Sequence, residues 1–298
     1  MRKLLVAVLF ASMLCGAGLS GEKVTVALIT KAMDSEWWQT VRAGAQKCAK
    51  ENPDMTLVVL APDREINVQQ QIQIIEDQII NEVDVLVIAP CGAKEIIPTL
   101  DKAKAAGIPV VIFDTDADWA DKKAYVGSKN YDGGALAGEY IVKNLPNGGE
   151  VGLITGVMGH QTHIDRVQGA IDQIEKNAKI TIVSRQPANS ERALGMTVME
   201  NMLTSFPDME YLFATNDEMA LGASQAAQAV GSTVGIIGFD GTSEARNAIK
   251  SGLMVGTIDG NASGLGYESA KAGYMVAKGQ EIPKIVPVKL LLVTKDDL

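Results

Sequence analysis

The sequence predicts an α/β protein made of two similar lobes, each a parallel sheet flanked by helices. Short apolar runs rich in valine and isoleucine alternate with amphipathic segments of helical length after residue 22. The apolar runs are continuous, which is typical of strands buried on both faces of a sheet. The alternation restarts after residue 134, which favours two domains of similar size over one very large sheet.

The first block begins at residues 24–29 with the run VTVALI. Its strands are expected at residues 24–29, 56–61, 83–90 and 108–114. Its helices are expected between them, at residues 37–52, 68–82 and 93–107. A strand, a helix and a second parallel strand form a right-handed unit, so this order predicts a parallel sheet.

The second block repeats this order after the segment AYVGSKNYDGG. Its strands are expected at residues 150–156, 180–186, 211–215 and 234–240, and its helices at residues 133–144, 164–177, 191–204 and 218–231. A last helix is expected over residues 263–278 and an extended tail over residues 285–293. No low-complexity linker separates the blocks, so an ordered crossover is expected near Ser128, and the last segments are free to cross back.

Residues 1–20 are expected to be a signal peptide. Arg2 and Lys3 precede an apolar stretch, and small residues follow it. This order is typical of secretory leaders, and the stretch is shorter than the ~20 residues that a membrane-spanning helix needs. The alternatives are a buried N-terminal element and a lipoprotein anchor at Cys15, which Leu14 disfavours because a small residue is wanted there. The mature chain is therefore expected in the periplasm.

The charge balance disfavours some classes of partner. The chain has 36 acidic and 27 basic residues, a formal net charge of −9, and removal of a basic leader makes it more acidic still. Nucleic acids and anionic membranes attract basic proteins, so neither is an expected partner.

The sequence lacks the motifs of several catalytic and cofactor sites. No glycine-rich nucleotide-binding loop follows a strand, and no G-x-S-x-G segment is present. The two histidines, His160 and His163, lie in the segment HQTH without further clustered ligands, so no metal site is predicted. No catalytic residue and no cofactor are predicted either.

Polar side chains follow most of the predicted strands. Ligands of open parallel sheets bind at the carboxyl ends of the strands, where these side chains would meet. The residues there are 34–38, 90–91, 114–116, 159–166, 189–190, 216–217, 240 and 259–261. Carboxylates, amides and hydroxyls satisfy the hydroxyl groups of a ligand, and aromatic faces pack against its C–H groups. The pattern predicts a polyhydroxylated ligand.

Trp37 and Trp38 pose a separate question, because they are adjacent and the chain has only three tryptophans. They could serve core packing, a protein interface or ligand binding. Two adjacent residues are not expected to face the core together from a regular strand or from one side of a helix. A protein interface and ligand binding both stay open on this ground; the strand-end position, together with the family resemblance described below, favours stacking of at least one indole ring on the ligand.

Several segments resemble those of the periplasmic ribose-binding protein family, the type I sugar-binding components of ABC transporters. The resemblance covers the chain from about Lys23 to its end. It is carried by the segments VVIFDTD (110–116), RQPANSERALGMTVMENMLT (185–204), FATNDEMALGA (213–223) and IIGFDGT (236–242). Repressor ligand domains share such segments but follow a DNA-binding helix-turn-helix, whereas this chain begins with a predicted leader.

The resemblance implies two lobes joined by three crossings, with the ligand in the cleft between the lobes. The N-terminal lobe is expected over residues 22–128 plus 260–289, and the C-terminal lobe over residues 129–259 plus 290–298. Closure around the ligand is implied to be a hinge motion that presents a composite surface to a membrane permease.

The resemblance also implies a set of ligand contacts. Asp114, Asn216 and Asp240 match the family's polar contacts, and Trp37 and Trp38 match its pair of flanking aromatic rings. Helix capping is the alternative role for Asp114, Asn216 and Asp240, and it is the favoured role for Asp217. The full set expected to bind ligand comprises Ser35, Trp37, Trp38, Cys91, Asp114, Thr115, His163, Arg166, Ser190, Asn216, Asp240, Gly260 and Asn261.

The chain departs from the family's ribose binder at several of these positions. Thr115 stands where an arginine is expected, Ser190 where a third aromatic ring is expected, and Gly260 near an expected glutamine. We expect Trp37 to fill the space that the small Ser190 leaves, while Trp38 covers the other ligand face. Loss of an arginine fork makes ribose a poor fit and favours another monosaccharide or a sugar alcohol.

The sequence thus predicts a monomeric, non-enzymatic solute-binding protein that delivers a monosaccharide or polyol to a permease. The alternatives are a sensor that docks on a chemoreceptor or sensor kinase, a binder of a furanosyl signal molecule or nucleoside, and an exported sugar-processing enzyme.

Overall fold

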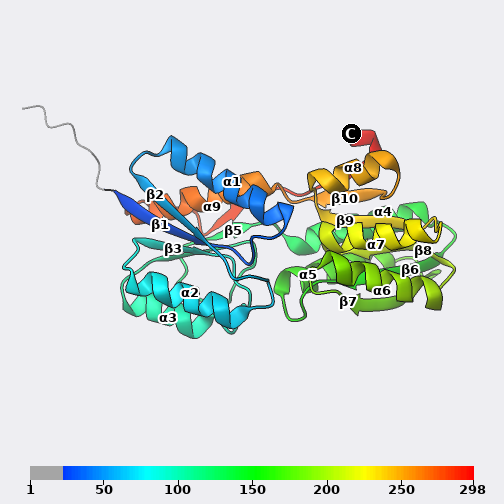
Figure 1. The fold of residues 1–298 in the computed structure, drawn as a ribbon, viewed down its shortest axis with the longest axis horizontal. Coiled ribbons are helices and arrows are strands. Elements are labelled where there is room, and N and C mark those ends of the chain that lie inside the picture. The colour runs from blue at the N-terminus through cyan, green and yellow to red at the C-terminus, as the bar shows by residue number, and fades with distance from the viewer. Residues whose placement is uncertain (1–22) are drawn as a thin grey trace, which may run out of the picture.

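The structure is a computed structural model that describes residues 23–298, and it consists of two lobes side by side (Figure 1). Each lobe is built on a six-stranded sheet with helices on both faces. The predicted α/β fold of two similar lobes is confirmed. The predicted signal peptide lies outside the described residues, and none of the described helices has the length and apolar character to span a membrane.

The sheet of the first lobe is parallel throughout. Its strands are β1 (Val24–Ile29), β2 (Met55–Leu60), β3 (Val85–Ile88), β4 (Val110–Phe113), β5 (Tyr125–Gly127) and β11 (Ile285–Pro287). They lie in the order β11-β5-β4-β3-β1-β2. Its helices are α1 (Glu36–Glu51), α2 (Val68–Ile80), α3 (Ile97–Ala105) and α9 (Ala262–Ala277).

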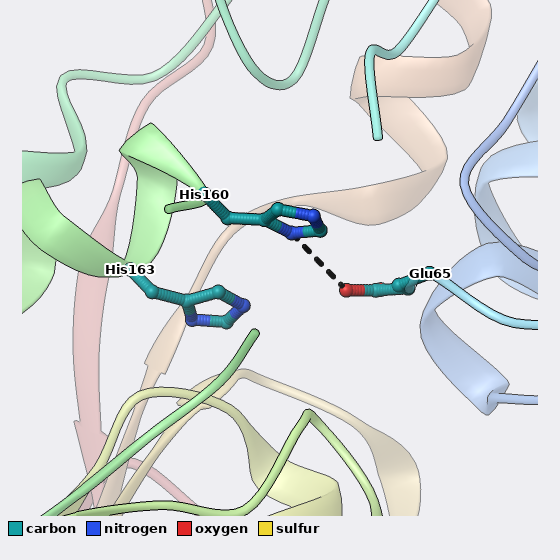
Figure 2. A group of neighbouring side chains, drawn as sticks. All are labelled: Glu65, His160 and His163. Carbon is teal, nitrogen blue, oxygen red and sulfur yellow. Dashed lines mark ion pairs between the residues drawn. The ribbon is translucent and has the colours of Figure 1, made fainter. Parts of the chain in front are cut away.

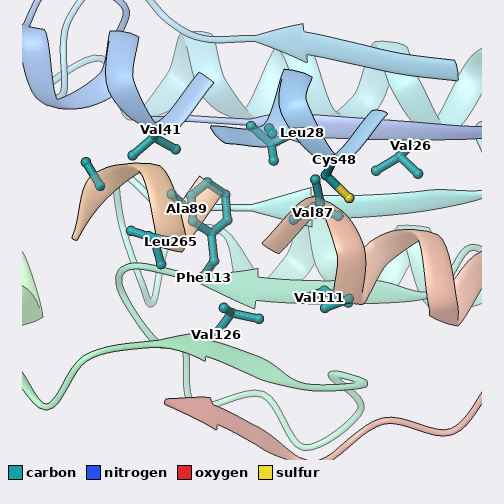
Figure 3. Packing of buried hydrophobic residues seen from close by; sticks show 14 of the residues in the cluster. Val26, Leu28, Val41, Cys48, Val87, Ala89, Val111, Phe113, Val126 and Leu265 are labelled. Carbon is teal, nitrogen blue, oxygen red and sulfur yellow. The ribbon is translucent and has the colours of Figure 1, made fainter. Parts of the chain in front are cut away.

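Alternate residues of each strand supply two separate cores. Val26 and Leu28 of β1 point to the core under α1 and α9, where Phe113 of β4 also packs (Figure 3). Ala27 and Ile29 point to the opposite core, under α2 and α3. Helices cover both faces of the sheet, so neither set of alternate side chains along a strand can be polar. This explains the continuous apolar runs of the sequence.

The sheet of the second lobe has the same layered plan with one difference. Its strands are β6 (Gly149–Thr155), β7 (Ile180–Pro187), β8 (Met209–Ala214), β9 (Gly235–Asp240), β10 (Gly256–Asp259) and β12 (Leu291–Thr294). They lie in the order β12-β10-β9-β8-β6-β7. The edge strand β12 is antiparallel to β10, so this sheet is mixed rather than wholly parallel as predicted.

Helices again cover both faces of the second sheet. Helices α4 (Asn130–Asn144) and α5 (Gln161–Ile174) lie on one face, whereas α6 (Arg192–Ser205), α7 (Asp217–Ala229) and α8 (Ser243–Ser251) lie on the other. A short 3-10 helix, η1 (Lys295–Asp297), ends the chain.

The chain passes between the two sheets three times: between β5 and α4, between β10 and α9, and between β11 and β12. The predicted extended tail is therefore two strands, one in each sheet. Strand β5, helix α8 and strand β10 have no counterpart among the predicted ranges. With three, nine and four residues, they are too short for a periodic pattern to stand out.

Candidate functional site

The carboxyl ends of the strands of both sheets face each other across a small cavity of about 30 Å³ between the lobes. It is lined by Lys31, Ser35, Trp37, Trp38, Glu65, Asp114, Thr162, His163, Arg166, Asn216 and Asp240. Eight of these eleven residues belong to the predicted set. Charged side chains and two indole rings thus meet in one enclosed space.

The tryptophan pair lies at the start of α1, where Ser35 caps the helix by accepting a hydrogen bond from the Trp38 amide (3.4 Å). Both indoles are buried, with exposed fractions of 8 % and 2 %, and they meet edge to face with 6.5 Å between ring centroids. Both belong to the core of the first lobe and both line the cavity. The expectation that adjacent residues could not both face inward is wrong, because the first turn of α1 lies at the boundary of core and cavity.

The two rings have different neighbours. Trp38 packs edge-on against Phe113 and donates from Nε1 to Oε1 of Glu65 over 2.8 Å. Trp37 lies so close to Gly260 that a Cβ there would be 2.6 Å from the Trp37 Cη2 atom. Gly260 and Trp37 together line a second, smaller cavity, and Gly260 does not line the interlobe cavity. Trp37 packs on the segment between β10 and α9, so its position depends on where the chain crosses between lobes.

Asp114 follows β4 and forms a buried ion pair with Lys31, with 2.7 Å between Oδ2 and Nζ. Thr115 Oγ1 donates to the same carboxylate over 3.1 Å and lies 2.5 Å from the Lys31 ammonium. Both recorded contacts of the carboxylate are on Oδ2, so a ligand would be bound through Oδ1. Thr115 is buried in this network and does not line the cavity.

Arg166 on α5 is held in place by the second lobe. Its guanidinium donates to the Thr215 carbonyl (2.8 Å) and to Asn130 Oδ1 (2.9 Å), and it stacks 3.6 Å from the centroid of the Phe239 ring. Asp240, at the end of β9, lies 3.7 Å from it. The resulting planar cation beside a carboxylate suits a ligand with adjacent hydroxyl groups.

Two neighbouring carboxyls of the second lobe are buried. Burial raises the pKa of Asp240 well above its usual value, and Arg166 opposes this rise. Burial also raises the pKa of Asp217 to about 7, although Thr257 and Thr242 donate hydrogen bonds to it. Asp217 does not cap α7; the cap is Asn216, whose Oδ1 accepts from the Met219 amide over 2.9 Å.

His163 forms part of the same wall of the cavity. Its Nδ1 is 2.9 Å from Thr215 Oγ1 and its Nε2 is 3.1 Å from Ser190 Oγ. Burial keeps the pKa of His163 well below its usual value, so the ring is neutral. The side chain that meets Ser190 is thus His163, whereas Trp37 packs on Gly260, contrary to the expected filling of the Ser190 space. Ser190 itself lines a separate cavity toward the surface.

Besides Thr115, Ser190 and Gly260, two further predicted residues, Cys91 and Asn261, lie outside the cavity lining. Cys91 is buried, its amide donates to Gln71 Oε1 (2.7 Å), and burial raises the pKa of its thiol to about 12. Asn261 caps α9 by accepting from the Gly264 amide (3.1 Å) and is exposed. Each therefore has a local structural role.

Three residues of the lining are not in the predicted ligand-binding set: Lys31, Glu65 and Thr162. Thr162 does lie in the predicted strand-end range 159–166. Lys31 is two residues past the end of β1, whereas the predicted range there begins at Asp34. Glu65 follows β2, for which the prediction names no strand-end residue. The strand-end rule applied to every strand would have found both.

The lobes also touch outside the cavity. Glu36 at the start of α1 accepts hydrogen bonds from the amides of Ser243 (2.7 Å) and Glu244 (3.3 Å), in the first turn of α8. Arg64 and Glu191 form an exposed ion pair across the mouth, with 3.2 Å between their charged atoms. These contacts hold the lobes together around the cavity.

Comparison with known proteins gives a consistent result. A family model described as a periplasmic binding protein domain matches residues 26–281. The ribose import binding protein of Salmonella typhimurium is 33 % identical over 274 residues, which are 92 % of this chain and 91 % of that protein.

Two solved structures of solute-binding proteins are also similar to the chain. A solute-binding protein of an ABC transporter from Actinobacillus succinogenes, with bound D-allose, has a TM-score of 0.87 and 30 % identity over 92 % of this chain and 99 % of its own. Another, from Bacillus halodurans with bound myo-inositol, has a TM-score of 0.87 and 28 % identity over 93 % and 96 %. The chain therefore belongs to the periplasmic binding protein family that includes the ribose import binding proteins.

Proposed function

We propose that this protein captures a monosaccharide or a related polyol in the cavity between its lobes and delivers it to the permease of an ABC transporter. The observation that carries the proposal is the composition of the cavity. Two indole rings and Asp114 come from the first lobe, and Arg166, Asn216 and Asp240 come from the second. Paired donors and acceptors suit ring hydroxyls, and the indoles suit the C–H faces of a sugar.

Access to this cavity requires the lobes to open. The cavity of about 30 Å³ is much smaller than the ~300 Å³ or more of typical small-molecule pockets. A ligand would enter an open form and bring the lobes together, so affinity depends on the contacts and on the closing equilibrium. We assign residues 22–128 plus 260–289 to one lobe and 129–259 plus 290–298 to the other, in keeping with the sheet to which each strand belongs.

The proposal includes no chemical step. The carboxylates of Asp114 and Asp240 lie beside Lys31 and Arg166, where they would bind hydroxyl groups rather than transfer protons. We further propose that the mature protein is a periplasmic monomer, in keeping with its predicted leader and with relatives named as import binding proteins.

A thermal-shift screen over pentoses, hexoses, polyols and nucleosides tests the ligand class. A ligand that binds only the native state raises the melting temperature, so a monosaccharide or polyol should stand out. A hit among nucleosides alone would replace the proposed ligand class. Turnover of a hit on prolonged incubation would show an enzyme instead.

Titration calorimetry with the hit then tests the site. Replacement of Asp240 by asparagine should leave ligand hydroxyls poorly paired and reduce affinity by about 1–3 kcal/mol. Asp208→Asn, at an exposed position before β8 and so at the opposite end of that strand from the cavity residue Asn216, serves as the control. Equal affinity of the wild type, Asp240→Asn and Asp208→Asn for the ligand would show that Asp240 does not contribute to binding.

A further inference from the structure

Three side chains with metal-binding atoms meet at one end of the interlobe cavity. Figure 2 shows Glu65, His160 and His163 turned toward one another. One ligand atom of each lies within 4.8 Å of the others. Glu65 comes from the loop between β2 and α2 in the first lobe, whereas the histidines come from the start of α5 in the second. The cluster exists only when the lobes are together.

His160 is the member of this cluster that most needs a partner. Its side chain is only 4 % exposed, yet neither Nδ1 nor Nε2 has a hydrogen-bond partner. Oε2 of Glu65 is 3.9 Å from Nδ1, which is too far for a hydrogen bond, and the backbone of Cys91 also lies near the ring, where it opposes the larger lowering of the pKa of His160 by burial. A buried imidazole with both nitrogens unpaired is unusual and calls for an explanation.

The other two side chains are held by hydrogen bonds, and the ring of His163 lies nearly parallel to that of His160, with 6.1 Å between their centroids. Trp38 binds Oε1 of Glu65 through a 2.8 Å hydrogen bond, so the free oxygen, Oε2, faces His160. Thr215 lies 2.9 Å from Nδ1 of His163, so Nε2 of that ring is directed toward Ser190 at 3.1 Å. Hydrogen bonds of this kind orient the ligands of metal sites.

We propose that Glu65, His160 and His163 bind a divalent transition-metal ion such as Zn²⁺ and thereby link the two lobes. Two imidazoles and one carboxylate form a donor set that Zn²⁺ accepts, and imidazole disfavours Mg²⁺ and Ca²⁺. Ligand distances of about 2.0–2.2 Å require the three groups to move closer together. The Nε2 atom of His163 would exchange the Ser190 hydroxyl for the metal.

This site is coupled to closure of the lobes, because its ligands come from both of them. A metal that binds only the closed arrangement shifts the equilibrium toward it. Glu65 and His163 also line the cavity, so the fourth coordination position would face the ligand space. The metal ion would therefore assist closure independently of which sugar binds.

The test is titration of tag-free, EDTA-stripped protein with Zn²⁺, and separately with Ca²⁺, in the absence of any sugar. The wild type and the control Glu200→Gln, which alters an exposed carboxylate on α6, should bind one Zn²⁺ per chain. His160→Ala and Glu65→Gln should each bind Zn²⁺ at least about tenfold more weakly, since even neighbours of metal ligands contribute that much. The affinity for Ca²⁺ should not differ between the wild type and these variants.

A second variant guards against misfolding. In EDTA, His160→Leu should melt at or above the temperature of the wild type, because it replaces an unpaired polar ring with an apolar side chain. With Zn²⁺ added, only the wild type and the Glu200→Gln control should show a rise in melting temperature and a smaller radius of gyration by small-angle scattering.

Equal Zn²⁺ affinity in the wild type, His160→Ala and His160→Leu would overturn the proposal. The binding would then be adventitious binding to surface carboxylates. The absence of Zn²⁺ binding by the wild type would also overturn the proposal. Because no sugar is present, either result is independent of the outcome of the sugar screen.

Discussion

The pair of Lys31 and Asp114 shows how single residues shape this cavity. Both side chains are almost fully buried, and each neutralises the other at the end of the first sheet. Burying two charges is costly, and the pair persists because the ammonium also lies against Thr115. The strand-end rule identified Asp114 but could not show that Lys31, two residues past the end of β1, would occupy one of its oxygens.

This pairing leads to a prediction about stability. Asp114→Asn keeps the shape of the side chain and tolerates the left-handed backbone at this position (φ 60°). It leaves Lys31 as an unpaired buried charge, so the free energy of unfolding should fall by about 3–5 kcal/mol in urea titrations. Lys31→Met added to Asp114→Asn should restore most of the loss.

The exposed pair of Lys104 and Asp121 offers a matched control. Asp121→Asn should change the free energy of unfolding little, because solvent screens both charges. A destabilisation by Asp114→Asn no larger than that of Asp121→Asn would contradict the account of the buried pair.

Asp217 gives the second lobe a dependence on pH. Its pKa is raised to about 7 by burial, so the folded protein favours the protonated carboxyl. That contribution to stability is fully present below the unfolded pKa of about 4 and is lost as the pH rises through about 7. Asp240, whose pKa is raised in the same direction, adds to this loss.

The wild type should therefore lose stability between pH 4 and pH 7 relative to Asp217→Asn, when unfolding free energies are measured across that range. Asp208→Asn, at an exposed site, should keep the slope of the wild type. If Asp217→Asn had the same slope as the wild type, Asp217 would be ionised throughout the range.

At the scale of elements, the strands and helices with long apolar patterns were predictable. Strand β1 and helix α1 begin within one residue of the predicted ranges, because burial imposes the pattern directly on the sequence. Strand β5 and strand β10 were not predictable, since a few residues carry no period and their place depends on pairing with distant strands.

The candidate site was predictable only in part, for the same reason. Strand ends pointed to Asp114, Asn216 and Asp240, which do line the cavity. The roles of their partners depend on contacts between segments far apart in the chain, such as the hydrogen bond between Lys31 and Thr115, which are 84 positions apart. No local pattern encodes such a contact.

Helices α1 and α8 are joined across the two lobes by the hydrogen bonds of Glu36, a contact that we call the Glu36 clasp. Glu36 on α1 accepts from two amides in the first turn of α8, where the helix dipole favours a negative charge. Because the two helices belong to different lobes, this capping contact exists only in the closed form. Removing it should favour the open form.

Glu36→Ala should therefore weaken ligand binding by about 0.5–2 kcal/mol, the range for loss of a helix cap, mainly through faster ligand release. Stopped-flow measurement of release of the ligand found by the screen gives the rate. Glu51→Ala, at the other end of α1 and bonded to Tyr267 within the same lobe, is the control. Equal release rates in the two variants would rule out the clasp.

At the scale of the whole molecule, the two sheets present their carboxyl ends to one enclosed space, and three crossings of the chain allow the lobes to move. Each lobe supplies part of the cavity lining, so under the proposed function neither lobe alone would bind a ligand well. Under that proposal binding and closure are one process, to which the Glu36 clasp and the proposed metal site would both contribute.

The most direct test of this account is a crystal structure with the ligand found by the thermal-shift screen. We expect the ligand between the lobes, with at least one of the Trp37 and Trp38 rings in van der Waals contact and with Asp240 and Arg166 hydrogen-bonded to its hydroxyls. A ligand bound outside the interlobe cavity, or within it but touching neither indole, would contradict the account.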